Sequence, residues 1–198
     1  SFTDAHIEKL DKTIKEYRLL KKGMMKKLLT EGIGHSEYKE TEIGRIPKEW
    51  EVKTYGEVFT TVTDYVANGS FASLKDNVRY LSDESYAYLI RIQDYTNGFK
   101  DNFVYIDEHA YDFLSKSKLY TDDIVLSNVG AVGTIFKVPN LNKPMSLGPN
   151  AILVRTLLDR DYVYYWLQSD NGKENLKRIT TTTAQPKFNK TDFKTLLC

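Results

Sequence analysis

The first thirty residues carry a hydrophobic pattern that is typical of a helix pairing with another helix. There is no proline between residues 4 and 29, and apolar side chains recur there at steps of three, four or seven residues. This spacing places them on one stripe of a helix, in which Lys21 occupies one stripe position. Residues 1–31 are therefore predicted to form one long helix, in which residues 4–29 span about 40 Å. The stripe consists of Ile7, Leu10, Ile14, Tyr17, Met24 and Leu28.

Such a stripe needs a second surface against it. One interpretation makes the helix an element of the globular core, and the other pairs it with a second helix. The remaining sequence contains no other rod of similar length, so we expect the companion in another copy of the chain, in a different subunit, or in sequence outside this chain. A homodimer through the N-terminal helix is the arrangement that we predict.

The next segment is polar and then becomes apolar. Residues 32–44 combine glycines with alternating Glu, Lys and Tyr, and are predicted to form a connector loop. Pro47 and Trp50 follow, and we interpret them as the entry turn of a globular domain, with the indole as its apolar anchor.

The remaining pattern alternates between short strands and short helices. Residues 53–60 are predicted to form a short helix or strand, and residues 60–77 a polar loop with a turn at 68–70. The predicted helices are 108–115 and 161–169, the second ending near Gly172. The strands are expected at residues 86–94, 103–106, 123–127, 134–138 and 151–155, with turns at 97–98, 128–133 and 148–150. Residues 45–198 are thus predicted to be an α+β domain with a mixed sheet, attached to a long helix that forms a coiled coil.

Charge is distributed unevenly, although the net charge of the 198 residues is only +1. Residues 1–30 and 173–194 each have a net charge of +4, whereas residues 31–57 have a net charge of −3. A basic segment near the end of the chain fits a local phosphate-binding face. It fits a chance segregation of solvated charge equally well.

Composition and motifs exclude several classes of protein. The chain is 41% hydrophobic and 28% charged, has no apolar run long enough to cross a bilayer, and has a single cysteine, Cys198. We therefore expect a cytoplasmic protein without a disulfide framework, and the start and end of the sequence suggest a fragment. The only glycine motif is Gly130-x-x-Gly133, which lacks the lysine of a phosphate-binding loop. His6, His35 and His109 lack zinc-site spacing, so we expect no metal, no cofactor and no catalytic residue.

Two stretches resemble the central region of type I restriction–modification specificity subunits. They are Lys21-Lys-Gly-Met-Met-Lys-Lys-Leu-Leu-Thr-Glu-Gly32 and Glu42-Ile-Gly-Arg-Ile-Pro-Lys-Glu-Trp-Glu-Val52. In that family this region joins a spacer helix to the second target-recognition domain. Three further stretches agree with such a domain: Leu89-Ile-Arg-Ile-Gln-Asp94, Asp123-Ile-Val-Leu-Ser-Asn-Val-Gly-Ala-Val-Gly133 and Gln185-Pro-Lys-Phe-Asn-Lys-Thr-Asp-Phe-Lys194.

The resemblance implies a non-catalytic protein that reads double-stranded DNA. In this family two target-recognition domains, separated by two antiparallel spacer helices, read a split sequence. Methyltransferase (modification) subunits add the methyl group, and a restriction/translocase subunit cleaves. This chain holds one helix and one recognition domain, so it resembles half of a subunit. Pairing of two halves through the helix would restore two domains about a two-fold axis.

Candidate DNA contacts follow from side-chain chemistry. Arginine fits guanine, and glutamine or asparagine fits adenine, whereas lysine and threonine hydroxyls suit phosphates. The base-contact candidates are Arg79, Arg91, Gln93, Asn128 and Gln185. The backbone-contact candidates are Lys75, Lys143, Arg178, Thr181, Thr182, Thr183 and Lys187.

Two other functions compete with DNA reading. The first is a scaffold that dimerises through the helix, recruits a methyltransferase and binds no DNA, which the nearly neutral net charge favours. The second is an enzyme that uses residues 127–133. The target sequence depends on loop geometry and does not follow from the residues.

Overall fold

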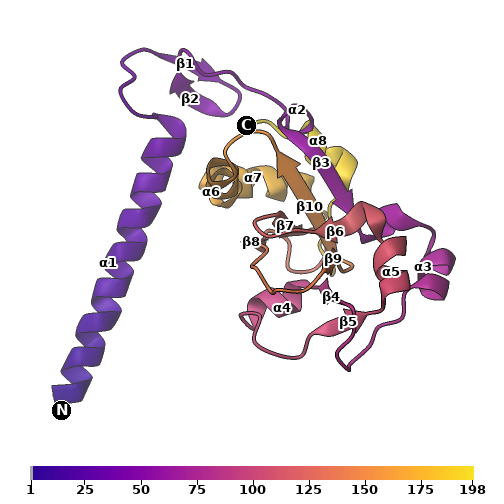
Figure 1. Cartoon of the computed structure of the whole chain (residues 1–198). Helices are drawn as coiled ribbons and strands as arrows, with labels where there is room; N and C mark the ends of the chain where they lie inside the picture. Colours follow the sequence, from indigo (N-terminus) through magenta and orange to yellow (C-terminus); the bar gives the residue numbers. More distant parts are fainter. Residues whose placement is uncertain (1) are drawn as a thin grey trace.

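The computed structural model describes residues 2–198, which form one long helix and a compact head (Figure 1). The helix α1 (Phe2–Thr30) extends away from the head as a rod and occupies nearly the range that the hydrophobic stripe predicts. It ends where Gly32 adopts a φ of +67°, a left-handed conformation that glycine reaches without the steric cost of a Cβ atom. A Cβ atom at Gly32 would also lie 2.6 Å from the His35 ring and 2.8 Å from the Trp50 ring.

A small hairpin follows the helix. Strand β1 (Tyr38–Thr41) pairs antiparallel with β2 (Gly44–Pro47). The prediction of a polar loop over residues 32–44 is therefore wrong for its second half, because the backbone groups of this charged segment are satisfied by the strand that follows. The Trp50 ring packs edge-on against His35, with the ring centroids 5.8 Å apart. Trp50 is half-buried, and its role as the apolar anchor of the head stays a prediction.

The head contains two four-stranded sheets. The first has the order β3–β10–β7–β8, with all neighbours antiparallel. The second has the order β5–β4–β9–β6, in which β4 and β9 are parallel and the other pairs are antiparallel. The predicted α+β fold with a mixed sheet is confirmed. The strands are β3 (Phe59–Asp64), β4 (Ala87–Ile90), β5 (Val104–Ile106), β6 (Lys118–Leu119), β7 (Ile124–Ser127), β8 (Ile135–Lys137), β9 (Met145–Leu147) and β10 (Ala151–Thr156).

Short helices connect the strands and cover the sheets (Figure 1). Their first turns are fixed by side-chain caps, because Asp107, Asp159, Ser169 and Asn189 each accept a hydrogen bond from a backbone N–H in the turn that follows. The helices are α2 (Tyr55–Val58), η1 (Tyr65–Asn68), α3 (Phe71–Asn77), α4 (Ile92–Thr96), α5 (Glu108–Phe113), η2 (Ser115–Ser117), α6 (Arg160–Gln168), α7 (Asp170–Ile179) and α8 (Lys190–Thr195).

The first sheet is buried on both faces in its centre. Along β7, Ile124 and Leu126 pack into a cluster with α6, α7 and α8, whereas Val125 packs toward the second sheet. Along β10, Ile152 and Leu153 divide between the same two clusters, and both are completely buried. This explains why both strands are continuous apolar runs in the sequence.

Two predicted segments differ in kind from what the structure shows. The strand expected at residues 86–94 stops at Ile90, and helix α4 begins at Ile92, directly after its N-cap residue Arg91. The change is caused by Asp94, whose carboxylate accepts hydrogen bonds from the backbone N and the guanidinium of Arg91. The polar loop expected at residues 60–77 consists instead of β3, η1 and α3, with only the predicted turn at 68–70 between the last two.

Helix α7 was not predicted, because Gly172 was interpreted as the end of α6. The structure explains the glycine differently. A Cβ atom at Gly172 would lie 2.4 Å from the carbonyl oxygen of Trp166 and 2.7 Å from that of Leu167. The glycine therefore allows α7 to begin in close contact with the end of α6. Among residues 2–198, no helix is long and apolar enough to cross a membrane.

Candidate nucleic-acid interface

Several strands of both sheets end at one edge of the head. Strands β4 and β9 run parallel with Ile90 opposite Leu147, so both end on this side. Strand β10 begins there, with Ala151 opposite Ser127, the last residue of β7. Strand β3 also ends there, at Asp64. We call the segments that meet here the loop edge, which comprises residues 91–93, 128–133, 148–150 and 180–189.

The turn at residues 148–150 joins the two sheets at this edge. The Gly148 N–H donates to the carbonyl oxygen of Ile90 at 2.7 Å, and a Cβ atom at Gly148 would lie only 2.9 Å from that oxygen. The carbonyl oxygen of Asn150 accepts a hydrogen bond from the Asn128 N–H at 3.2 Å. Glycine is thus required for the close approach that brings the end of β4 beside the loop after β7.

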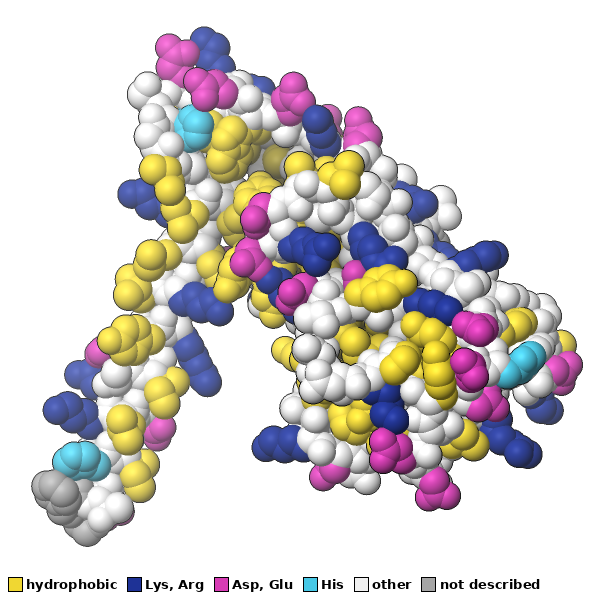
Figure 2. Space-filling view, viewed as in Figure 1, with side chains coloured by type: hydrophobic (Ala, Val, Ile, Leu, Met, Phe, Trp, Pro, Cys, Tyr) yellow, Lys and Arg dark blue, Asp and Glu magenta, His cyan; other side chains and the backbone are white. Residues whose placement is uncertain are grey.

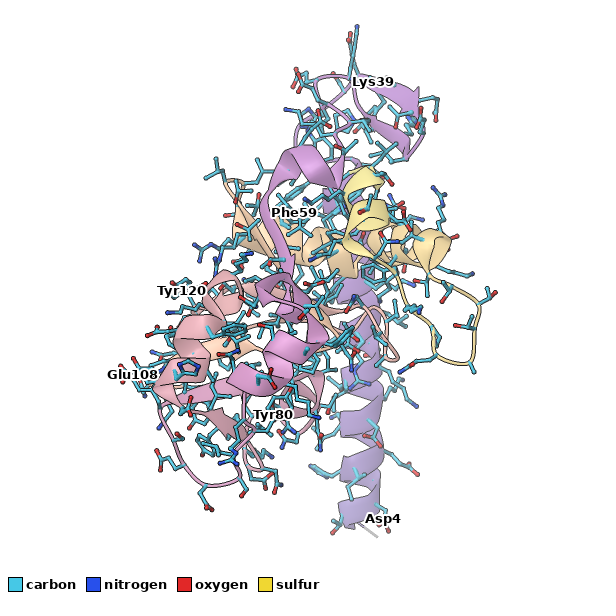
Figure 3. All side chains as sticks on the ribbon, turned by 90° about the vertical axis from the view of Figure 1, so that its right-hand side faces the viewer. Asp4, Lys39, Phe59, Tyr80, Glu108 and Tyr120 are labelled. Atoms are coloured by element: carbon cyan, nitrogen blue, oxygen red, sulfur yellow. The ribbon has the colours of Figure 1, made fainter. Side chains whose placement is uncertain are left out.

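Residues 180–189, the threonine loop, lie against the loop after β7. The Thr181 N–H donates to the carbonyl oxygen of Lys187 at 2.9 Å, and the Gly130 N–H donates to that of Pro186 at 2.8 Å. Figure 3 shows this loop extending from the right-hand side of the head, whereas Tyr120, which precedes β7, is labelled on the left. Residues 180–188 contain no helix.

Asn128 is held by the threonine loop and still has an unused acceptor. Its Nδ2 donates to the carbonyl oxygen of Phe188 at 3.2 Å. Its Oδ1 is buried and has no hydrogen-bond partner among the residues that the structure describes. A buried amide oxygen without a hydrogen-bond donor costs free energy unless a ligand or water supplies one. Among the base-contact candidates, Asn128 therefore has the clearest unsatisfied hydrogen-bond acceptor.

A hollow of about 500 Å³ lies beside Asn128, between η1, α3 and the turn at 148–150. Lys75 lines it, and Phe71 lies at its side with 84% of its surface exposed. Burial, together with a hydrogen bond to Tyr80, raises the pKa of Tyr65 in the wall of the hollow. The hollow is lined by one cation, Lys75, and one carboxylate, Asp64.

The structure gives Arg91 a structural partner. Its Nη2 donates to Oδ1 of Asp94 at 2.7 Å and to the carbonyl oxygen of Asn102 at 2.8 Å. Asp94 is completely buried, so it needs this cation as its counter-charge. Arg91 lies at the loop edge, but several of its donors are already engaged. Its role as a guanine reader stays a prediction, as does that of Gln93, which is exposed on α4.

Most of the remaining candidates lie on or beside the loop edge. Thr181, Thr182, Thr183, Gln185 and Lys187 are exposed on the threonine loop, and Thr183 Oγ1 donates to the carbonyl oxygen of Gln185 at 2.9 Å. Arg178 is exposed in the last turn of α7, directly before this loop, and Arg79 is exposed just after α3.

Lys143 lies apart from the other candidates. It precedes the first residue of β9, at the end of that strand opposite to the loop edge. Its Nζ forms an ion pair with Glu84 at 2.9 Å and donates to the carbonyl oxygen of Ser85 at 2.7 Å. The structure therefore does not bring Lys143 together with the other candidates, and its phosphate contact stays a prediction.

One charged pair near the loop edge was missed by sequence reasoning. Lys190 Nζ lies 2.7 Å from Oδ1 of Asp64 and ties the start of α8 to the end of β3. Asp64 also accepts a hydrogen bond from the Ala67 N–H, which starts η1. The two residues are far apart in the sequence, and only the basic composition of residues 173–194 pointed toward Lys190.

The stripe along α1 is exposed. Its six predicted pairing residues retain these exposed fractions: Ile7 53%, Leu10 59%, Ile14 46%, Tyr17 68%, Met24 54% and Leu28 43%. Among residues 3–30 only Leu29 is buried, where the last turns of the helix reach the head. Figure 2 shows hydrophobic side chains along the stalk. The interpretation of this helix as a core element is therefore wrong, and pairing through the stripe stays a prediction.

Comparisons with known proteins extend over nearly the whole chain. The chain is 28% identical over 200 residues, 92% of its length, to the type I restriction enzyme MjaVIII specificity subunit of Methanocaldococcus jannaschii. It is 46% identical over 54 residues, 27% of its length, to the putative type I restriction enzyme MjaX specificity subunit of the same organism. These matches cover 43% and 13% of the two relatives, respectively. No protein-family model matches the chain.

A solved structure shares the fold. The HsdS subunit from Thermoanaerobacter tengcongensis superimposes with a TM-score of 0.52 at 14% identity, over 98% of this chain and 44% of that one. Its likeness includes the long helix, because it covers almost every residue described. The chain is thus similar over most of its length to a type I restriction enzyme specificity subunit, and it spans less than half of the length of the relatives that it matches.

Proposed function

We propose that this chain is the DNA-reading part of a type I restriction–modification system and recognises one half of a split target. The observation that carries the proposal is its similarity over 92% of its length to a protein named as a specificity subunit. The loop edge supports it, because loops from both sheets and the threonine loop present polar side chains side by side. Arg, Gln and Asn side chains there would contact bases, and Lys and Thr side chains would contact phosphates.

The apolar stripe on α1 would pair this chain with a second copy, whose head would read the other half of the target. Apolar side chains that are 43–68% exposed along one helix favour a companion helix, since a single chain leaves them in water. A second copy of the chain would place two heads about a two-fold axis, with the rod setting the separation of the half-sites.

The catalytic steps belong to other subunits in this proposal. The chain docks methyltransferase subunits, which add the methyl group, and a restriction/translocase subunit, which cleaves. Sequence-selective binding by this chain then decides where both reactions occur. A cytoplasmic location follows from the location of the DNA that such a system acts on.

Reconstitution with the cognate methyltransferase subunits tests the proposal. Mapping of methylated positions on genomic DNA should show one split motif. Methylation at scattered positions, or methylation that does not depend on this chain, would contradict sequence reading.

The backbone contacts are tested separately with a Lys187→Ala, Arg178→Ala double variant. It should weaken binding to all duplexes and reduce the dependence of log Kd on log salt by about 2, because each lost phosphate contact removes roughly 0.9 from the slope. The matched control is Lys39→Ala, Lys48→Ala, which removes two exposed charges in and directly after the β1–β2 hairpin, outside the loop edge. An unchanged slope in the first variant would remove Lys187 and Arg178 from the interface.

A scaffold function without DNA binding is the second candidate. Two observations favour it: the net charge of only +1, and the engagement of Arg91 by Asp94. It predicts stable association with the methyltransferase and no salt-sensitive binding of DNA, so the same titration separates the two functions.

A further inference from the structure

A basic groove lies between the stalk and the head, away from the residues assigned above to DNA contacts. It has a volume of about 410 Å³ and is lined on one side by the second half of α1 and on the other by the junction of α6 and α7. Figure 2 shows dark-blue side chains on the side of the stalk that faces the head. Its charged lining residues are Arg18, Lys21, Lys22 and Lys26 from α1, Lys173 from α7 and a single acidic residue, Asp170.

Little of this positive charge is neutralised within the chain. Lys22 Nζ lies 3.2 Å from Oδ2 of Asp170, but both side chains are more than half exposed, and such surface pairs contribute little. Lys21 lies over the ring of Tyr165, with its Nζ 5.6 Å from the ring centroid. Arg18, Lys26 and Lys173 have no ion pair with any carboxylate among residues 2–198. The groove therefore has a surplus of cations, which attracts a polyanion.

Helix α7 continues this charge from the groove to the loop edge. Its buried face contains Gly172, Asn175 and Leu176. Its exposed face carries Lys173 and Lys177, four residues apart, with one acidic residue, Glu174, beside them. Residues at this spacing are neighbours on one helix face. The helix begins at the groove and ends at Ile179, directly before the threonine loop. Its ten residues span about 15 Å, which matches about four nucleotide steps of 3.4 Å along a DNA strand.

We propose that the groove and the exposed face of α7 form one phosphate-binding track that holds the DNA backbone beside the half-site. This inference rests on the proposed function and extends it from the bases that are read to the adjoining DNA. The track begins at Arg18, Lys22 and Lys26, continues through Lys173 and Lys177, and reaches Lys187. It makes no base contacts, so it fixes position and orientation and adds affinity for every sequence.

The track and the pairing stripe use different faces of α1. Arg18, Lys22 and Lys26 follow one another at four-residue steps. They lie on average about 130° around the helix from Tyr17, Lys21, Met24 and Leu28, of which Lys21 also lines the groove. A companion helix on the stripe therefore leaves the basic face open. Continuity with the threonine loop favours DNA over an acidic protein segment as the occupant.

The test compares two triple variants of the full chain, which remove equal charge. The track variant is Arg18→Gln, Lys26→Gln, Lys173→Gln, in which glutamine retains helix propensity. The control is Lys39→Gln, Lys100→Gln, Lys116→Gln, three exposed lysines outside the groove. Binding to a random-sequence duplex is titrated with potassium chloride, and thermal unfolding verifies that both variants fold.

The track variant should reduce the slope of log Kd against log salt by about 2 to 3, and the control should leave it unchanged. Equal slopes for the track variant and the unaltered chain would overturn the proposal while leaving the proposed function intact. Loss of methyltransferase co-purification by the track variant, with its slope unchanged, would assign the groove to an acidic protein partner and would also overturn it. If the unaltered chain shows no salt-dependent binding, the proposed function fails first.

Discussion

The stalk and the head contain similar apolar side chains in opposite surroundings. Along α1, Leu10 and Tyr17 are 59% and 68% exposed, whereas Ile152 and Leu153 of β10 are completely buried. Burial of apolar surface is the main favourable term in folding, at roughly 25 cal/mol per Å². The head therefore carries its own stabilisation, and most of the stripe on α1 gains none within a single chain. The difference shows that regular periodicity specifies a helix without showing what covers it.

The largest expected effect is on the core of the head. Phe193 is completely buried, with its ring centroid 5.0 Å from that of Tyr55 and 5.8 Å from that of Phe188. Phe193→Ala should lower the free energy of unfolding by about 3–5 kcal/mol, because it leaves a cavity. Urea denaturation followed by tryptophan fluorescence measures the change. Tyr17→Ala on the stalk is the control and should change the unfolding of a monomer by less than about 0.5 kcal/mol; equal effects would refute the contrast.

A glycine in the head should tolerate a methyl group poorly. Gly172→Ala places a Cβ atom against two backbone carbonyl oxygens that cannot move without shifting α6, the shorter contact being 2.4 Å. We expect a loss of about 3 kcal/mol from this overpacking. The same denaturation experiment measures it. A variant as stable as the original would show that α6 and α7 are not in such close contact.

Charges placed on the stripe should affect association but not the head. Leu10→Lys, Ile14→Lys should weaken pairing of the helices by about 2 kcal/mol or more, because it puts like charges into an apolar seam. Sedimentation equilibrium at tens of micromolar should then show monomers in place of dimers, while the urea midpoint of the head stays unchanged. An original chain that is already monomeric would contradict self-pairing.

The smallest effect has the opposite sign to that at Gly172. Gly23 lies within α1, and a Cβ atom there would meet nothing within 4 Å. Gly23→Ala should stabilise the helix by about 1 kcal/mol, since alanine loses less backbone entropy. Circular dichroism at 222 nm should show a higher melting temperature for the helical signal. A lower melting temperature would mean that the glycine serves a contact made only in the assembly.

The hydrophobic pattern of the sequence predicted those helices and strands that are specified by residues close together in the chain. The spacing of the apolar residues predicted α1, and apolar runs bounded by turns predicted β7, β8 and β10 close to their observed limits. Asp159 and Asp107 cap the predicted helices α6 and α5. These signals depend on residues within one or two turns of each other, so no knowledge of the partner surface was needed.

The failures came from burial and packing that the residue types alone do not reveal. Gly172 was taken as a helix end because the sequence does not show that the glycine meets the end of α6. The sequence also does not show that Asp94 is buried beside Arg91, whose role as a base reader stays a prediction. The loop edge as a whole depends on the parallel pairing of β4 with β9, which lie far apart in the chain.

The candidate residues could be chosen by type but not by place. Asn128, Gln185 and Lys187 were chosen for their hydrogen-bonding groups, and the structure brings them together through the threonine loop. Lys143 met the same chemical criterion and lies at the opposite end of its strand. Only the register of the strands shows that Lys143 lies away from the loop edge and the other three residues at it.

The two ends of the head's chain segment meet beside the top of the stalk. Lys53 and Cys198 exchange backbone hydrogen bonds of 2.9 and 2.8 Å, and the Tyr55 N–H donates to the carbonyl oxygen of Leu196 at 2.7 Å. A head joined to its surroundings at a single point can be exchanged as a cassette, because the replacement needs to match only that junction. Under the proposed function, an exchange at these two positions would transplant a different DNA preference while the dimensions of the rod stay the same.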